Sequence, residues 1–179
     1  ILAKCIVDFH ITETANANPY VFPLYLYPST DSGGLFAAQR RVPNLNEAIV
    51  DKIAADLGLR FVPEKGPEAG VFAPIDLLDY IYAVLHSPVY RERYRAFLKI
   101  DFPRVPYPAD ADTFWRLVAY GGALRAAHLL ESPAVEAAAA EYAYPVGGDN
   151  RVEKGYPKYL SGAVFINETQ YFGGVPESV

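Results

Sequence analysis

The chain has 179 residues, a formal net charge of −5 and 51% hydrophobic residues, enough apolar sequence to form a sizeable core and to argue against intrinsic disorder. No apolar run approaches the ~20 residues of a membrane span, so we expect no membrane partner. The acidic balance also argues against a free-standing, non-specific nucleic-acid binder, which would normally be basic.

The first residue and the cysteine content indicate the context of the chain. The sequence begins with Ile1 and contains no methionine, so we expect a piece of a longer protein, truncated at one or both ends. Cys5 is the single cysteine, which excludes a disulfide framework and a thiolate zinc site within the chain. Because no signal-peptide pattern is present either, we expect a cytoplasmic protein.

The N-terminal part of the sequence predicts strands and then a helix. Residues 3–9 predict a buried strand, and residues 20–27 are rich in β-formers, with Pro23 indicating an edge or a bulge. Residues 28–34 predict a turn or loop. Asn44 or Asn46 can cap a helix that runs to about Leu57, before Gly58, and residues 61–70 predict a loop. The apolar residues of that helix at helical spacing are Ala48, Ile49, Ile53 and Leu57.

The middle of the sequence predicts two helices separated by a short break. Pro74 suits the first turn of a helix, and Asp76 and Asp79 lie near its positive end. Ser87-Pro88 interrupts the pattern and starts a second helix that runs to about Lys99, so the two should form a hairpin or a kinked pair. The expected apolar stripes are Leu78, Ile81, Tyr82 and Leu85 in the first helix, and Tyr90, Tyr94, Phe97 and Leu98 in the second.

A proline-rich segment, residues 101–108, must be extended and leads into a third long helix. Asp110 or Asp112 can cap this helix, which runs to about Leu130, and Gly121-Gly122 inside it predicts either a kink or the close approach of another backbone. Residues 135–140 predict a short helix, and 144–179 predict short strands and turns, most clearly over 164–166. We therefore expect a single α+β domain in which a central helical hairpin and a long helix are flanked by short mixed or antiparallel strands.

The sequence contains no complete catalytic constellation. His10, His86 and His128 are far apart and do not form a metal-binding motif, and no Gly-x-Ser-x-Gly elbow, phosphate-binding loop, Glu-x-Lys or Asp-x-Lys is present. Asn18-Pro19-Tyr20 is similar to the Asn-Pro-Pro-aromatic box of amino-methyltransferases with one proline missing, and we interpret it as a turn before a strand. We expect no catalytic residue, no metal site and no bound cofactor in this chain.

Basic residues beside aromatic residues are the main functional signal. Residues 91–104 carry five basic side chains against Glu92 and Asp101, and Arg91 and Arg95 are spaced to share one helix face. Other basic residues follow a Gly-Gly pair or alternate with tyrosines, and such patterns suit phosphate contact and base stacking. The alternative for each patch is an ordinary solvated surface. The candidate DNA-binding residues are Arg40, Arg41, Arg151, Lys154, Tyr156, Lys158, Arg91 and Arg95.

Several stretches resemble one family, the C-terminal target-recognition domain of type ISP restriction–modification enzymes. The matching stretches are residues 20–28, 43–45, 81–94, 101–106 and 166–176. The Leu-His-Ser-Pro-x-Tyr unit at 85–90 and the Asp-Phe-Pro-Arg-Val-Pro unit at 101–106 also resemble the region that follows the catalytic domain in adenine-specific methyltransferases.

The resemblance implies sequence-specific recognition of double-stranded DNA by a non-catalytic part of a larger enzyme. It implies that N6-adenine methylation takes place outside residues 1–179, that the methyltransferase domain of the same parent chain is a partner, and that S-adenosylmethionine, ATP and Mg²⁺ bind elsewhere in the parent. The alternative is a protein-interaction or scaffold domain without direct DNA contact, which the acidic net charge favours. No residue pattern supports an independent hydrolase.

Overall fold

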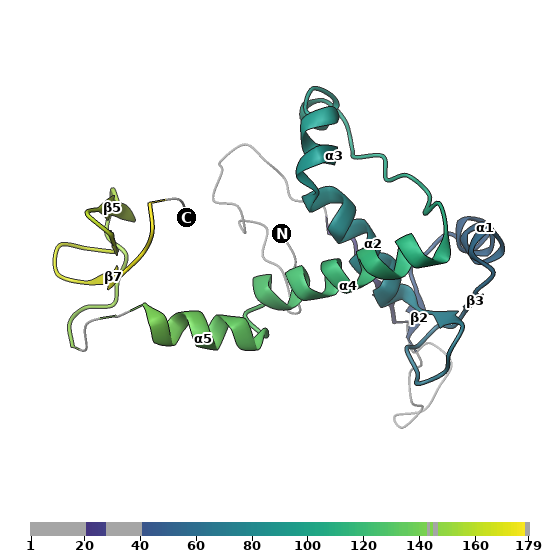
Figure 1. The fold of residues 1–179 in the computed structure, drawn as a ribbon, viewed down its shortest axis with the longest axis horizontal. Helices are drawn as coiled ribbons and strands as arrows, with labels where there is room; N and C mark the ends of the chain where they lie inside the picture. The colour runs from purple at the N-terminus through teal and green to yellow at the C-terminus, as the bar shows by residue number, and fades with distance from the viewer. Residues whose placement is uncertain (1–20, 28–40, 143, 145–146, 178–179) are drawn as a thin grey trace. The chain divides into compact units, whose positions relative to one another are not determined.

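The computed structural model describes residues 21–27, 41–142, 144 and 147–177 (Figure 1). Its helices and short strands make the chain a mixed α+β protein, as expected. We expected a single domain. Contacts divide the chain into two compact units, Ile1–Leu129 and Leu130–Val179, and each unit is described by itself. The strand predicted over residues 3–9, the loop predicted over 28–34, Cys5, His10 and Asn18-Pro19-Tyr20 lie outside the described residues.

The first described elements are two very short antiparallel strands, β1 (Tyr25–Leu26) and β2 (Val42–Pro43). Asn44 extends the pairing, because its backbone N–H donates to the carbonyl of Leu24 at 2.9 Å and its side-chain amide donates to the carbonyl of Pro23 at 2.9 Å. The strand predicted over residues 20–27 is therefore confirmed only near its end, after Pro23.

Helix α1 (Glu47–Leu57) begins and ends where the sequence predicts. The Asn46 side chain accepts a hydrogen bond from the backbone N–H of Ile49 at 3.2 Å, which caps the first turn. Gly58 closes the helix with φ 63°, a left-handed conformation that a glycine adopts without strain. The predicted apolar face is confirmed in part: Ile53 and Leu57 are buried, whereas Ile49 is exposed and Val50 is buried in its place.

A parallel pair of two-residue strands follows, β3 (Arg60–Phe61) and β4 (Val71–Phe72). The sequence predicts only a loop over residues 61–70, so this pairing was not predicted. Phe72 lies fully buried between Phe61 and Phe114, with ring centroids 5.4 and 5.8 Å away in edge-to-face arrangements. The short strands thus bring aromatic side chains into the core.

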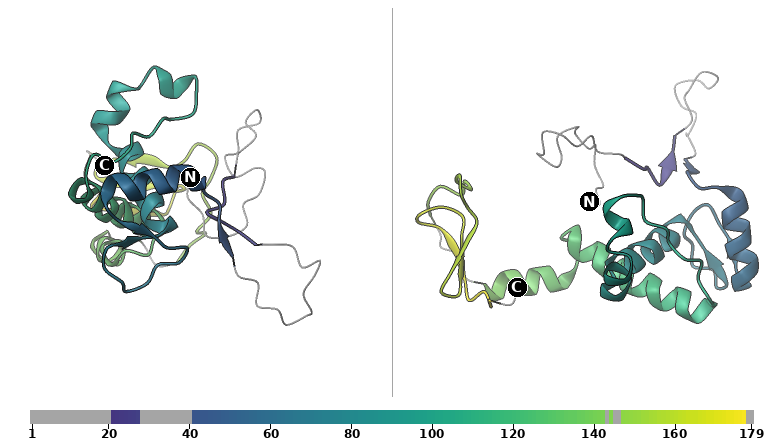
Figure 2. Two further views of the ribbon diagram at one scale, coloured as in Figure 1. Left: turned by 90° about the vertical axis from the view of Figure 1, so that its right-hand side faces the viewer. Right: turned by 90° about the horizontal axis from the view of Figure 1, so that it is seen from above.

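The first unit is organised around the crossing of two long helices, α2 (Pro74–His86) and α4 (Ala111–His128), visible in Figures 1 and 2. Asp110 caps α4 by accepting the backbone N–H of Thr113 at 2.7 Å. At the crossing, a Cβ on Gly121 would lie only 1.8 Å from the backbone oxygen of Asp79. Of the two roles predicted for Gly121-Gly122, the close approach of another backbone is confirmed, and α4 continues through the pair.

The buried face of α2 is turned by about one residue from the predicted stripe. Asp76 and Asp79 lie on the buried side, where Lys65 and Arg125 hold them with ion pairs of 2.8 and 2.6 Å. Because these carboxylates occupy part of the buried face, a search for apolar residues at helical spacing selects the wrong face of α2. The predicted stripe residues are only half-buried. The core cluster contains Val50, Ile53, Leu57, Phe72, Leu77, Tyr80, Val84, Tyr90 and Phe114.

The predicted break at Ser87-Pro88 is confirmed, but the second helix is shorter than expected. Helix α3 (Pro88–Arg93) is followed by a separate 3-10 turn, η1 (Phe97–Lys99). Phe97, expected in the core, is 69% exposed, because Tyr90 and the half-buried Leu98 make the inward contacts instead. The extended segment over residues 101–108 is confirmed, and the hydroxyls of Tyr80 and Tyr90 hold it by donating to backbone carbonyls at 2.9 Å.

The second unit combines one helix and a small sheet. Ser132 caps helix α5 (Pro133–Glu141), which confirms the predicted Ala-rich helix. Strands β5 (Lys158–Leu160), β6 (Ala163–Phe165) and β7 (Tyr171–Gly173) form an antiparallel sheet in chain order, and the strand predicted at 164–166 corresponds to β6. Across both units, none of the helices in the described part of the chain has the length and apolar character needed to span a membrane.

Candidate nucleic-acid interface

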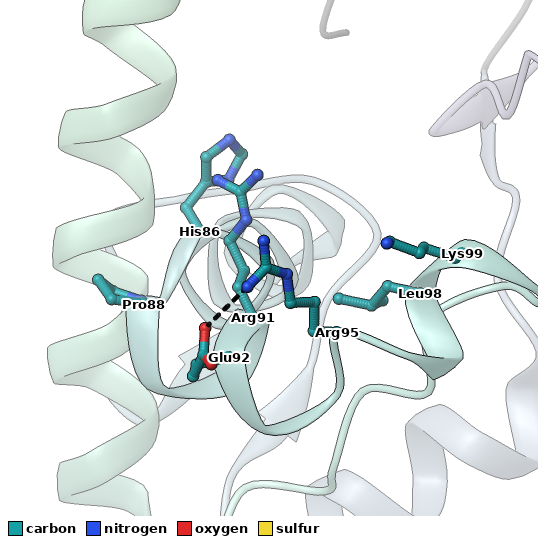
Figure 3. Close-up of a pocket in the computed structure, with 7 residues that line it drawn as sticks. All are labelled: His86, Pro88, Arg91, Glu92, Arg95, Leu98 and Lys99. Carbon is teal, nitrogen blue, oxygen red and sulfur yellow. Dashed lines mark ion pairs between the residues drawn. The ribbon is translucent and has the colours of Figure 1, made fainter.

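Basic side chains from α3 and η1 surround an open hollow of about 450 Å³, which we call the basic hollow (Figure 3). Arg91 and Arg95 extend from α3 and the turn after it, and the amine of Lys99 points towards them from η1. Arg91 and Arg95 therefore face the same space as expected, although they do not share a helix face, because α3 ends at Arg93. The residues that line the hollow are His86, Pro88, Arg91, Glu92, Arg95, Leu98 and Lys99.

Local structure explains why these side chains face the same space. The Ser87 hydroxyl accepts the backbone N–H of Tyr90 at 3.4 Å and, with Pro88, begins a new helix directly after α2. Tyr90 points inward and is buried, so residues one and five positions later can point away from the core. His86 is fixed by a 2.9 Å hydrogen bond from its Nδ1–H to the backbone carbonyl of Tyr82, which can only accept.

The cations of the basic hollow are only weakly engaged by carboxylates. Arg95 lies 4.0 Å from Glu92, and the two side chains are 73% and 80% exposed, so this ion pair contributes little. Among the described residues, no carboxylate lies within 4.0 Å of the charged groups of Arg91 or Lys99. An external anion would therefore displace few existing contacts.

Arg41 is in a very different environment. Its guanidinium donates two hydrogen bonds of 2.6 Å to the carboxylate of Glu64 and lies 3.9 Å above the ring centroid of Tyr25. The hydrogen bonds with Glu64 hold the pKa of Arg41 above its ordinary value. This arrangement ties β2 to the segment after β3, so Arg41 has a structural partner already. The neighbouring candidate Arg40 lies outside the described residues.

The remaining candidates lie together just before and at the start of β5, in a stretch we call the basic–aromatic segment, residues 151–158. Arg151, Lys154 and Lys158 are exposed, and Tyr156 is half-buried. The amine of Lys158 lies 4.5 Å from the ring centroid of Tyr156, a cation–π contact. The segment thus presents positive charge and an aromatic ring to the surroundings of the second unit.

Two buried polar residues that the sequence analysis did not single out support this segment. The amide of Asn167 donates to the backbone carbonyls of Asp149 and Arg151 at 2.6 and 3.0 Å, and the amide of Gln170 donates to the side chain of Asn150 at 2.6 Å. A further bond of 3.0 Å joins the N–H of Glu153 to the carbonyl of residue 166. Uncharged polar residues in a tight β-hairpin turn are the only sequence signal that could have indicated this role.

The fold brings together two of the three histidines. The rings of His86 and His128 lie 5.3 Å apart, and the hydroxyl of Tyr82 hydrogen-bonds to Nδ1 of His128. Burial raises the pKa of Tyr82 above its ordinary value. Within the described ranges, no group of three histidine, cysteine, aspartate or glutamate side chains could hold a metal ion. The third histidine, His10, lies outside these ranges.

A family model described as the type ISP C-terminal specificity domain matches residues 1–179, the whole chain. The chain belongs to this family. No curated protein and no solved structure matches it. As a type ISP specificity domain, it recognises DNA sequence within a restriction–modification enzyme, and such a domain is a recognition module rather than a catalytic one. The resemblance noted in the sequence is thereby confirmed.

Within the specificity domain, the predicted DNA contacts fall into separate places. Arg41 lies beside β2, Arg91 and Arg95 line the basic hollow, and the other four described candidates share the basic–aromatic segment. The structure adds His86 and Lys99 to the surroundings of Arg91 and Arg95. The specificity domain therefore carries two differently built basic surfaces, one recessed and one on a supported sheet segment.

Proposed function

We propose that this specificity domain directs N6-adenine methylation by a methyltransferase domain of the same parent chain, located outside residues 1–179. The whole-chain match to the family carries this proposal, because such a domain serves a larger restriction–modification enzyme. It is also supported by the units at 85–90 and 101–106, which resemble the region after the catalytic domain of adenine-specific methyltransferases. These units form the end of α2, the start of α3 and the extended segment beside the core.

On this proposal, the other parts of the parent enzyme bind S-adenosylmethionine, ATP and Mg²⁺, and the enzyme works in the cytoplasm. S-adenosylmethionine supplies the methyl group when it is bound there. The part of the chain that the structure describes offers no cluster suited to a metal ion, so we assign no step through a metal to these residues.

The basic–aromatic segment is our proposed base-reading surface. Arg151, Lys154 and Lys158 are exposed, and Asn167 holds the backbone at Asp149 and Arg151 in place, which suits side chains that must enter a groove in one orientation. Tyr156 adds a ring that can stack on a base or pack against a sugar. Arg40 and Arg41 stay predicted contacts, although Arg41 would have to exchange Glu64 for DNA.

The test compares the parent enzyme with its Arg151→Ala variant on two duplexes. One duplex carries the parent's methylation target, mapped by sequencing N6-methyladenine, and the other has the same bases in scrambled order. Loss of a bidentate arginine–guanine contact should reduce discrimination by about 1–3 kcal/mol, or roughly 5- to 150-fold. Arg116→Ala, on the exposed side of α4, is the matched control. Unchanged discrimination by the Arg151 variant would remove this residue from the base-reading surface.

The second candidate function is a protein-interaction domain without direct DNA contact. It is favoured by the acidic net charge and by exposed apolar side chains in and after η1, including Phe97, Ile100 and Phe102. Apolar side chains gathered on one surface are typical of protein contacts. If this alternative holds, a variant of the parent enzyme in which both basic surfaces are neutralised would keep the DNA affinity of the wild type.

A further inference from the structure

We propose that the basic hollow seats the sugar–phosphate backbone of duplex DNA, with Arg91, Arg95 and Lys99 contacting phosphates and not base edges. The inference rests on the proposed function to the extent that the domain must meet DNA. It goes further by assigning a sequence-independent, positioning role to one surface. Contacts of this kind fix the register and orientation of a protein on DNA, whereas base contacts provide the specificity.

The charge of the region is the first argument. Residues 91–104 contain five basic side chains and two acidic ones, although the whole chain carries a net charge of −5. Three of these basic residues, Arg91, Arg95 and Lys99, line the hollow with one acidic residue, Glu92, and such a local excess of positive charge attracts anions.

The availability of these cations is the second argument. Elsewhere in the first unit, Arg41, Arg60 and Arg125 form close ion pairs with Glu64, Glu68 and Asp79, at distances of 2.5–2.6 Å. By contrast, the closest carboxylate in the hollow is Glu92, 4.0 Å from Arg95. Phosphate contact would therefore not require the loss of a strong internal ion pair.

The shape of the surface separates phosphate contact from base reading. Base edges lie at the floor of a groove and are reached by a protruding helix, strand or loop. The basic hollow is recessed, and its cations point into it from α3 and η1 (Figure 3). A concave, positively charged surface fits the convex ridge of a DNA strand, where phosphates recur about every 3.4 Å along the axis.

The lining also argues against a small apolar ligand. Leu98 and Pro88 are its apolar members, and the other lining residues are charged or carry an imidazole. Pockets for small organic ligands are mostly apolar with a few polar groups, the opposite of this composition. An acidic protein segment is the competing occupant, and the experiment below distinguishes it from DNA.

The experiment measures DNA binding by the parent enzyme across a series of salt concentrations. The double variant Arg91→Gln/Arg95→Gln removes two exposed positive charges from the hollow. The control, Lys52→Gln/Arg60→Gln, removes two exposed positive charges from the same unit outside the hollow. Both are compared with wild type on a 30-base-pair duplex of arbitrary sequence and on a duplex that carries the mapped methylation target.

We expect the hollow variant to bind both duplexes more weakly by the same factor. The slope of log Kd against log salt should decrease by about 1.8, or about 0.9 for each of two phosphates. The control should leave the slope nearly unchanged. Unaltered affinity and slope would show that the hollow does not contact DNA and would favour an acidic protein partner.

Two further results would also overturn the inference. A loss confined to the target duplex would mean that these arginines read bases, and an equal effect of the control would mean that only overall charge matters. If the wild-type parent does not discriminate between the duplexes, sequence recognition fails. The slope of log Kd against log salt still decides whether the hollow contacts phosphate. Failure of sequence recognition and failure of the phosphate contact can therefore be told apart.

Discussion

Replacing Gly121 with alanine tests the helix crossing on which the first unit depends. The added Cβ would lie 1.8 Å from the backbone oxygen of Asp79, whereas side-chain Cβ atoms essentially never approach within 3.0 Å. The helices would have to separate by roughly 1.2 Å at this point. The free energy of unfolding should therefore fall by an amount at or above the upper end of the ~1–3 kcal/mol that is typical of overpacking. Alanine recovers ~1 kcal/mol of helix propensity, so we expect a net loss of about 2 kcal/mol.

The matched control is the same substitution at the next position, Gly122→Ala. There the nearest atom is a side-chain oxygen of Asp79 at 3.1 Å, which needs to give by only a few tenths of an ångström, so the loss should be much smaller. Urea unfolding followed by the fluorescence of Trp115, the single tryptophan, measures both variants. With a typical urea slope of about 2 kcal/mol/M, the midpoint should decrease by about 1 M for Gly121→Ala. A midpoint equal to or above wild type would refute the close crossing.

Three other predictions follow from buried or capped polar groups. Removing the partner of the 7%-exposed Asp79 by Arg125→Met should cost ~3–5 kcal/mol in unfolding free energy, and Asp79→Asn in that background should restore part of it. The backbone and hydroxyl of Thr113 hold the pKa of Asp110 below its ordinary value, so its stabilisation is present above the unfolded pKa and lost as pH falls through the folded one. The melting-temperature advantage of wild type over Asp110→Asn should therefore shrink below about pH 4, and a constant difference would contradict this. Asn167→Ala should cost ~1–3 kcal/mol and accelerate amide hydrogen exchange at residues 149–153, and unchanged exchange would show that Asn167 does not support the segment.

The features that the sequence predicted well depend on neighbouring residues. The caps at Asn46 and Asp110, the break at Ser87-Pro88 and the convergence of Arg91 and Arg95 on one hollow are set within four residues along the chain. Capping groups and helical spacing act over that distance, so their physical causes are visible in the sequence.

The features that the sequence could not provide depend on distant partners. The two-residue strands β3 and β4 are too short for a period-2 pattern, and their pairing joins residues on either side of a nine-residue stretch. The inward face of α2 was misjudged because Arg125 and Lys65 make buried carboxylates tolerable. The pair of Arg41 with Glu64 likewise spans 23 positions, so the local pattern marked Arg41 as available when it is engaged.

The way the basic–aromatic segment is supported bears on how a specificity domain could acquire a new target. Asn167 grips main-chain carbonyls of residues 149 and 151, and the N–H of Glu153 pairs with another backbone carbonyl. The exposed side chains of Arg151, Lys154 and Lys158 take no part in these bonds. Substitutions at such exposed positions usually change stability by less than about 0.5 kcal/mol. Evolution or protein engineering could therefore replace the exposed residues one at a time while the backbone hydrogen bonds that support the segment stay the same.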